Sequence, residues 1–390
     1  MSARQRFSAA EQAALADLRW DLHRHPELAW EEVRTQETLE RFLRAHGIAD
    51  VRRVARTGLV ARVAGRVAGT PPVALRGDID ALPVTEATGL EHASVHEGVM
   101  HACGHDVHAA WAAGAALLLA REPAPGEVSV VLQPAEEVGG GAREVLASGA
   151  LAGVGAIFGA HVDRRFAVGQ VVAQAGAVAA SADSFRIVLR GRGAHGARPH
   201  EGADPVVGLA HLVTALQTIV SRRLDPALPA VVTVGSLRAG SAPNVIPETA
   251  ELAGTLRATT PETRRLLVEE LDRVARGVAS ALGLAAEIAL VDGTPPVVNH
   301  EAAAAQAAEA ARRVLGPAAL APLGTTNMGG EDFAFYLERI PGCFLRIGAR
   351  EPGGEPTAAH SPRFVPAEEA LFVGAAVLAE CARIASQTPV

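Results

Sequence analysis

The sequence predicts an α/β protein with a mostly parallel sheet, into which a smaller ferredoxin-like domain is inserted. Two observations support this prediction. Short β-rich runs alternate with helical patterns towards both ends of the chain, which is typical of a parallel sheet covered by helices. The middle of the chain has the order β-α-β-β-α-β instead, which is the split βαβ pattern of a ferredoxin-like module.

The chain begins with two expected helices. Ser8 with Glu11 three residues later forms a capping box, which predicts a helix that continues to about His25. A second helix is expected from about Glu31 to Gly47, where glycine ends it. Strands are then expected at 59–63, 73–76, 128–132 and 154–159, with an Ala-rich helix at 107–120.

The inserted module is bounded by changes in pattern. Its expected strands are 184–190, 230–236, 250–256 and 285–291, and its expected helices are 205–222 and 261–282. The α/β character returns near Val297 with an Ala-rich helix at about 302–311. The sequence therefore predicts a discontinuous main domain, 1–179 plus 295–390, and an inserted domain, 180–294.

The composition is that of an ordinary globular protein. The chain has 390 residues, 49% of them apolar and 20% charged, and this length suggests two to three domains. The longest uncharged helical stretch, 109–120, is shorter than the ~20 residues that a membrane-spanning helix needs. The N-terminal segment MSARQRFSAAEQAAL lacks the apolar core of a signal peptide. We therefore expect no membrane partner.

Charge and cysteine content narrow the function further. The net charge is −7 without basic clusters, which argues against nucleic acids and anionic membranes as partners. Three cysteines, Cys103, Cys343 and Cys381, cannot form a disulfide framework, and an odd number fits the reducing cytoplasm. All 36 basic residues are arginine. The absence of lysine excludes Schiff-base chemistry, a pyridoxal-phosphate anchor and the lysine of a phosphate-binding P-loop.

The segment 101–108, HACGHDVH, holds the densest group of metal-ligand side chains in the chain. It includes Cys103 and His105, and thiolate and imidazole are groups that bind zinc and its neighbours. By itself, the segment is equally consistent with a histidine-rich loop that binds no metal. Its interpretation depends on which other side chains the fold brings near it.

Acidic and histidine side chains follow three of the predicted strands: Asp78 and Asp80, Glu136 and Glu137, and His161. Adjacent acids are usually only solvated. Here they stand at the carboxyl ends of strands, where open α/β sheets place their sites. Three such strand ends, with Cys103 and His105 opening the adjacent helix, are harder to explain by chance than any one of them. His360 completes the set, although a lone loop histidine is more often only exposed.

With these motifs in view, the chain resembles the aminoacylase/carboxypeptidase metallopeptidases. The resemblance is to the branch of hippurate hydrolase and the auxin-conjugate (indole-acetyl amino acid) amidohydrolases, and it covers nearly the whole chain. The motifs that carry it are, in order, RGDIDALP from Arg76, MHACGHDVH from Met100, QPAEE from Gln133, GAH ending at His161, GRGAHGARPH from Gly191, NVIP from Asn244, GTLR ending at Arg257, MGGEDFAFYL from Met328 and HSPRF from His360. One departure is AAHS, which has alanine before His360 where a larger apolar residue is common.

The resemblance implies a zinc-peptidase-like main domain that binds two divalent metal ions per subunit, of zinc, manganese, cobalt or nickel. The implied ligands are Cys103, His105, Glu137, His161 and His360, with Cys103 bridging the ions. Glu136 would be the general base, and Asp80 would support the ligands from behind. Asp78 is left out of the ligand set, because relatives in other branches carry histidine at this position.

The resemblance also implies that the inserted domain is a lid and a dimerisation domain. It would supply His195, Asn244 and Arg257 to the substrate. His195 would reach the active site of the partner subunit and help to hold the oxyanion. Arg257 would grip the substrate carboxylate, which suits the planar fork of arginine. The enzyme would then be a homodimer or a higher homo-oligomer.

The implied activity is that of a metal-dependent amidohydrolase acting on N-acyl amino acids or related small acyl conjugates. One alternative is a cysteine-type amidase with Cys103 as nucleophile and His105 or His161 as base, which leaves the five-ligand set unexplained. The other is a non-catalytic small-molecule binding protein on the same fold. Glu136 counts against it, because binding alone needs no base.

Overall fold

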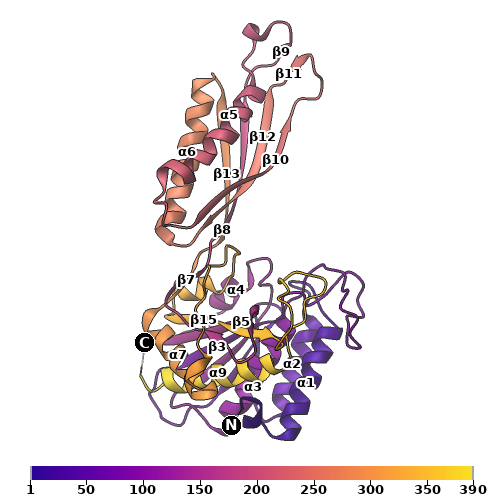
Figure 1. The fold of residues 1–390 in the computed structure, drawn as a ribbon, viewed down its shortest axis with the longest axis vertical. Coiled ribbons are helices and arrows are strands. Elements are labelled where there is room, and N and C mark those ends of the chain that lie inside the picture. The colour runs from indigo at the N-terminus through magenta and orange to yellow at the C-terminus, as the bar shows by residue number, and fades with distance from the viewer. Residues whose placement is uncertain (1, 389–390) are drawn as a thin grey trace. The chain divides into compact units, whose positions relative to one another are not determined.

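The fold is that of a computed structural model, which describes residues 2–388. The chain forms two compact units (Figure 1). The first unit comprises the chain up to Gly176, Val298–Gly324 and the chain from Asp332 onward. The second unit comprises Ala177–Val297 and Thr325–Glu331. The second unit is therefore an insertion in the sequence of the first.

The first unit is built on a seven-stranded sheet with the order β1-β2-β4-β3-β5-β15-β6. Its strands are β1 (Val51–Val54), β2 (Gly58–Val63), β3 (Val73–Asp78), β4 (Val128–Gln133), β5 (Ala156–Ala167), β6 (Val171–Val172) and β15 (Gly342–Arg350). The central strands β4, β3, β5 and β15 run parallel, and the outer strands pair antiparallel. Strands β3 and β4 are buried at every residue, which fits their continuous apolar runs. The predicted α/β fold with a mostly parallel sheet is confirmed.

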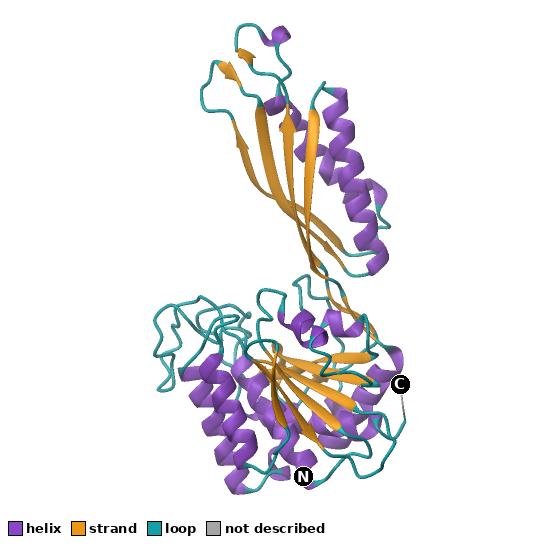
Figure 2. Cartoon of the chain, turned by 180° about the vertical axis from the view of Figure 1, so that it is seen from behind, coloured by secondary structure: helices purple, strands orange, loops and turns teal. Residues whose placement is uncertain are grey.

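Helices pack against this sheet in the first unit (Figure 2). Four of them lie side by side in the order α1 (Ala9–Arg24), α3 (His105–Arg121), α9 (Glu369–Ala385) and α7 (Glu301–Leu315). The shorter helices are α2 (Val33–Ala45), α4 (Gly141–Ala147), α8 (Ala334–Leu337), η1 (Arg4–Arg6) and η4 (Pro317–Ala319). The capping box predicted at Ser8 is present, because Ser8 Oγ accepts from the Glu11 N–H and the Glu11 carboxylate accepts from the Ser8 N–H.

The buried helix α3 depends on small residues for its close packing. A Cβ on Gly374 of α9 would lie 2.2 Å from the Trp111 ring of α3, and a Cβ on Gly77 of β3 would lie 2.4 Å from the carbonyl oxygen of His108. Close approach of this kind is a reason for glycine inside regular elements. It brings the end of β3 directly against the first turns of α3.

The second unit is a four-stranded antiparallel sheet with two helices, and its strand order is β10-β12-β8-β13. Along the chain its main elements are β8 (Ala182–Arg190), α5 (Pro205–Thr218), β10 (Ala230–Ala239), β12 (Thr249–Ala258), α6 (Pro261–Ala281) and β13 (Ala285–Thr294). This is the βαββαβ order that the sequence predicts. Its small elements are β9 (Ala194–His195), β11 (Val245–Ile246), η2 (Pro199–Glu201) and the π-helical turn η3 (Ile219–Arg223), and β7 (Gly176–Ala179) and β14 (Val297–Asn299) lie at its chain boundaries.

The structure differs from the sequence-based expectations in several places. Strand β5 continues to Ala167, so His161 lies within a strand and not after it; pairing with β15, which is distant in the sequence, extends it. Strands β1 and β15 and helix α9 were not expected from the local pattern. Helix α2 begins at Val33, later than expected, because Glu32 is its N-cap. Within residues 2–388, no helix has the length and apolarity needed to cross a membrane.

Candidate metal site

Side chains from neighbouring parallel strands meet at one edge of the seven-stranded sheet. Strand β3 ends at Asp78, and β4, its parallel neighbour, ends at Gln133 shortly before Glu136 and Glu137. Strand β5 pairs with β3 on the other side and carries His161. Because parallel strands end at the same edge, residues that are far apart in sequence come within reach of one another here.

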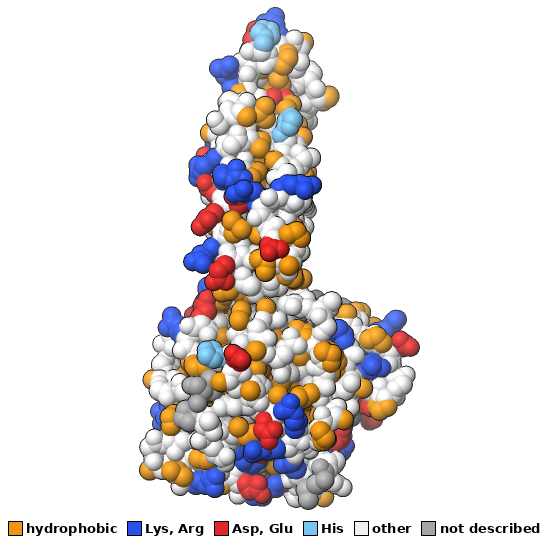
Figure 3. Space-filling model, turned by 60° about the vertical axis from the view of Figure 1, so that its left-hand side comes forward, with side chains coloured by type: hydrophobic (Ala, Val, Ile, Leu, Met, Phe, Trp, Pro, Cys, Tyr) orange, Lys and Arg blue, Asp and Glu red, His pale blue; other side chains and the backbone are white. Residues whose placement is uncertain are grey.

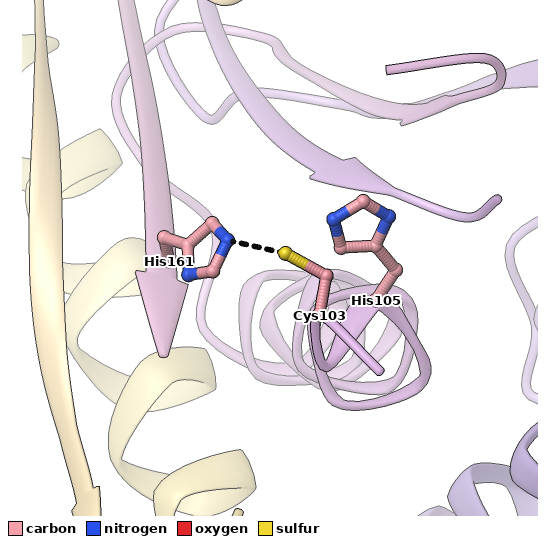
Figure 4. A group of neighbouring side chains, drawn as sticks. All are labelled: Cys103, His105 and His161. Carbon is pink, nitrogen blue, oxygen red and sulfur yellow. Dashed lines mark hydrogen bonds between the residues drawn. The ribbon is translucent and has the colours of Figure 1, made fainter. Parts of the chain in front are cut away.

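Cys103, His105 and His161 form one group of possible metal ligands (Figure 4). The Cys103 Sγ lies 3.2 Å from His161 Nε2 and stands between the two imidazole rings. His161 Nδ1 is 2.7 Å from the carbonyl oxygen of Val162, so it carries the proton and leaves the Nε2 lone pair free. Gly104, between Cys103 and His105, has φ of +89°, and a Cβ there would lie 2.6 Å from Val162 Cγ2. Only glycine fits this turn.

Cys103, Glu137 and His360 form a second group that shares the sulfur with the first. His360 Nε2 lies 3.5 Å from Glu137 Oε2, and His105 Nε2 lies 3.8 Å from Glu137 Oε1. His360 has φ of +68°, and its N–H donates to the carbonyl oxygen of Ala102 at 2.8 Å. The loop that carries His360 is thus tied to the segment that carries Cys103.

Glu136 forms a further group of possible ligands with His105 and Glu137, but its contacts differ from those of Glu137. Its Oε2 is 4.0 Å from His105 Nε2, and its Oε1 accepts a hydrogen bond from the Asp332 N–H at 3.3 Å. The two adjacent acids follow Ala135, which has φ of +53°. Because of this turn, one acid faces His360 and the other faces Asp332.

Asp80 lies behind His105 and Glu137. Its Oδ1 is 3.2 Å and its carbonyl oxygen 2.9 Å from His105 Nδ1, and its Oδ2 accepts from the Glu137 N–H at 2.9 Å. Two acceptors at Nδ1 hold a proton there and fix the ring, and His105 Nε2 then lies 3.6 Å from Asp78 Oδ2 and 3.8 Å from Glu137 Oε1. Asp80 thus sets the orientation of two possible ligands at once.

Asp78 is close to the site, but both of its oxygens have other partners. One accepts from Arg76 Nη1 at 2.5 Å, and the other lies 2.5 Å from His108 Nδ1. Although burial opposes ionisation, the Arg76 guanidinium holds the pKa of Asp78 well below its usual range. His108 in turn accepts from the Val162 N–H through Nε2, so both of its nitrogens are engaged.

A buried polar network beneath the site was not assigned from the sequence. The Arg76 guanidinium binds Asp332 Oδ1 and Gln133 Oε1, both at 2.9 Å, and Tyr336 donates to Gln133 at 3.1 Å. The signal for it was present, because Arg76 and Gln133 are polar residues in otherwise apolar strands. Buried polar groups of this kind are almost always paired. Their partners could not be named before the fold joined distant segments.

The electrostatics of the two ligand groups call for a cation. Among the described residues, His105 Nε2 and Glu137 Oε1 are buried without a hydrogen-bond partner. Burial, and then Glu137, raises the pKa of the Cys103 thiol, while burial raises the pKa of Glu137 to about 7 against the attraction of His105. Burial lowers the pKa of His161 and favours the neutral imidazole, which is the form that binds metals. Soft and hard donors around unpaired atoms therefore fit a divalent metal ion.

The other expected substrate residues belong to the second unit, where they do not form one cluster. His195 pairs with Val245 in the β9–β11 ribbon, and the Gly196 N–H donates to the Asn244 carbonyl oxygen at 2.7 Å. Arg257 stands near the far end of β12, eight residues beyond Thr249, where the strand begins. At about 3.3 Å per residue, that is roughly 26 Å along the strand.

The chain is similar to known proteins along most of its length. Residues 74–384 match the profile of "Peptidase family M20/M25/M40". The chain is 40% identical over 375 residues to an N-acetyl-L-cysteine deacetylase of Bacillus subtilis (strain 168), covering 95% of this chain and 87% of that protein. It is 37% identical over 378 residues to IAA-amino acid hydrolase ILR1-like 4 of Arabidopsis thaliana, covering 94% and 84%.

A solved structure gives the same result. The crystal structure of a Bacillus subtilis protein, described as a dinuclear metal binding peptidase from the M20 family, superposes with a TM-score of 0.87 at 37% sequence identity. The match covers 98% of this chain and 100% of that one. The likeness therefore extends over the whole fold and not only over the motifs.

Proposed function

The chain belongs to peptidase family M20/M25/M40, and within this family we propose that it hydrolyses the amide bond of N-acyl amino acids or related small acyl conjugates. It is a metal-dependent amidohydrolase by its similarity to deacetylases and amino acid-conjugate hydrolases. The observation that carries the proposal is the pair of ligand groups that share Cys103, with Glu136 beside them.

We assign the metal ligands as Cys103, His105, Glu137, His161 and His360. Cys103, His105 and His161 would hold one ion and Glu137 and His360 the other, and the Cys103 sulfur belongs to both groups. The ions would be zinc, manganese, cobalt or nickel, which accept mixed sulfur, nitrogen and carboxylate ligands. When bound, they would lower the pKa of a water molecule and polarise the scissile carbonyl.

Glu136 is assigned as the general base. Its contact with the Asp332 N–H fixes the position of the carboxylate, which can accept a proton from the water. The same carboxyl group would then give the proton to the leaving amine, a role that typically contributes 10²–10⁴-fold, an order-of-magnitude range. Glu137 is assigned to the metal instead, because its Oε2 lies 3.5 Å from His360 Nε2 and its Oε1 lies 3.8 Å from His105 Nε2.

A cysteine-type amidase is the second candidate, since Cys103 Sγ lies 3.2 Å from His161 Nε2. A nucleophilic cysteine needs a lowered pKa. Here burial and Glu137 raise the pKa of the Cys103 thiol, and burial lowers the pKa of His161, so neither favours a thiolate–imidazolium pair. These directions count against a nucleophilic Cys103, and metal dependence of the activity separates the two candidates.

In the second unit, His195 is assigned to the oxyanion and Arg257 to the substrate carboxylate, with Asn244 as a further substrate contact. His195 Nδ1 accepts from the Ala197 N–H at 3.0 Å, so the neutral ring carries its proton on Nε2 and can donate it to an oxyanion. His195 and Arg257 lie at opposite ends of β12, so one copy of this unit would present them to two different sites. We therefore propose that His195 serves the partner subunit's site.

A homodimer through the second unit is supported by two neighbouring features of its surface. Helix α5 has no Asp, Glu or Arg, and exposes Val206, Val207 and Ala210, whereas α6 exposes several charged side chains. Apolar side chains are visible along the surface of this unit (Figure 3). Strand β10, against which α5 packs, is an edge strand with Leu237 exposed. An uncharged helix beside an open strand edge suits pairing with a second copy.

The substrate proposal is tested by turnover of a panel with the metal-reconstituted enzyme. The panel contains acetyl, benzoyl, indole-acetyl and succinyl amino acids. Each is paired with an analogue that has the same amide bond but lacks the α-carboxylate. We expect hydrolysis of at least one acyl amino acid and much weaker turnover of its carboxylate-free analogue, because Arg257 would have no partner. No hydrolysis of any member by metal-loaded enzyme would count against the proposal.

The partner-subunit role of His195 is tested by mixing variants. His195→Ala should lower kcat by about 10²–10³, the usual effect of losing one oxyanion donor. When His195→Ala chains exchange subunits with Glu136→Gln chains, each mixed dimer has one site with both defects and one with neither. Activity should then reappear in proportion to the fraction of mixed dimers. Native mass spectrometry measures that fraction. Exchange without recovery would favour a site built within one chain.

A further inference from the structure

The turn before the two site glutamates is held by an acid from another part of the chain. Glu32, the N-cap residue of α2, is fully buried, and its Oε1 accepts from the Ala135 N–H at 2.8 Å. Its Oε2 accepts from Thr57 Oγ1 at 2.5 Å. Ala135 precedes Glu136 and Glu137 directly, so this contact bears on the backbone from which both of them project.

This turn needs support, because Ala135 has φ of +53°, which an L-residue with a Cβ seldom adopts. Such a conformation costs ~1–2 kcal/mol and persists only where its surroundings impose it. The Ala135 carbonyl oxygen accepts from the Gly140 and Gly141 N–H groups at 3.3 and 3.2 Å. With Glu32 on the N–H, both backbone polar groups of Ala135 are fixed.

The Glu32 carboxyl group is buried, and its hydrogen bonds run to Thr57 and Ala135 and not to an arginine or histidine of the described residues. Burial raises the pKa of this carboxyl group against the Thr57 hydrogen bond, and the nearby Asp80 charge raises it as well. A buried carboxylate without a cation is costly. The Glu32 side chain makes no capping hydrogen bond to α2, so a cap does not explain its burial. Its contacts point towards the Ala135 turn instead.

We propose that Glu32 is a positioning residue, which holds the Ala135 turn and thereby aims Glu137 at the metal ligands and Glu136 at the reacting water. This inference rests on the proposed function for the role of the two acids. The contact itself is a property of the fold. Glu32 thus resembles two other supporting acids. Asp80 accepts from the Glu137 N–H, and the Asp332 N–H donates to Glu136.

Glu32→Ala and Glu32→Gln test this role, with Glu27→Ala as the matched control. Glu27 lies in the same segment, and its carboxylate accepts from the N–H groups of Arg34 and Thr35 in the first turn of α2. It supports the helix but does not touch the turn. All proteins are compared for Zn²⁺ affinity in competition with a chelating dye, for amide hydrogen exchange in residues 134–141, and for thermal stability.

We expect Glu32→Ala to weaken Zn²⁺ binding by about tenfold, the lower range for residues that orient metal ligands, and to speed amide exchange in 134–141. Glu32→Gln should recover most of both, because its amide can accept from Ala135 and donate to Thr57. Glu27→Ala should lower only the melting temperature. If Glu32→Ala does not fold, Thr57→Val should show a smaller change in the same direction.

The proposal would be overturned if Glu32→Ala had the same Zn²⁺ affinity and exchange rates as Glu27→Ala. A Glu32→Gln variant that recovers neither property would overturn it too. If Glu32→Ala does not fold, an unchanged Thr57→Val would have the same meaning. These readouts do not depend on turnover. A chain without amidohydrolase activity would refute the proposed function while leaving the positioning result readable, so the two failures are distinguishable.

Discussion

Removing the bound metal should abolish hydrolysis, and adding zinc, manganese or cobalt should restore it. The expectation rests on five side chains in two groups that share one sulfur, and on two buried atoms, His105 Nε2 and Glu137 Oε1, that lack a partner among the described residues. Without a cation, the scissile carbonyl loses its Lewis acid, and the water from which Glu136 takes a proton keeps its ordinary high pKa.

The measurement is turnover against metal content in the same samples, through exhaustive chelation and stepwise re-addition. The chelator is one that does not bind the protein, and it is removed by dialysis before the assay. Any loss of activity is then due to loss of metal and not to inhibition by the chelator. Full activity in protein with no detectable metal would contradict metal dependence and favour the cysteine-type amidase. Alkylation of Cys103 is not a substitute for this test, because it disables the site in both cases.

Glu136→Gln should lower kcat by about 10²–10⁴ while metal content stays near normal, and Glu137→Ala should lower metal occupancy itself. The difference follows from their contacts. Glu136 is held by the Asp332 N–H, whereas Glu137 faces His105 and His360. Glutamine keeps the size of Glu136 but cannot take up a proton.

The two variants are compared at saturating substrate, with metal content measured by elemental analysis before each assay. Added metal should rescue part of the activity of Glu137→Ala and none of that of Glu136→Gln. Full metal occupancy in both variants, or near-normal turnover of Glu136→Gln, would show that the two roles are assigned wrongly.

The sequence was sufficient for the fold class and for the sheet edge where these residues meet. Strands β3 and β4 could be predicted because they are buried on both faces and read as continuous apolar runs, and the Ser8 capping box because its two contacts are local. The pattern failed where pairing is long-range. His161 was placed after its strand because β15, which extends β5, lies nearly 200 residues further along the chain (Gly342 pairs with Ile157).

The supporting residues were harder to predict than the ligands. Thiol, imidazole and carboxylate side chains can bind a metal by virtue of their functional groups alone, so Cys103 or His105 could be selected from the sequence. Arg76, Asp332 and Glu32 act through the contacts that the fold gives them, across 256 residues in the case of Arg76 and Asp332. A local pattern holds no information on such partners. Glu32 in particular stands in a helix-start position that suggests only a cap.

The most direct test of the metal site is anomalous diffraction from crystals of the protein prepared with Mn²⁺, recorded near the manganese absorption edge. We expect two peaks per subunit, both next to Cys103, with His105, Glu137, His161 and His360 as the other protein neighbours and Glu136 unbound beside them. No peak among these side chains in crystals of active protein, or peaks only elsewhere, would contradict the assignment.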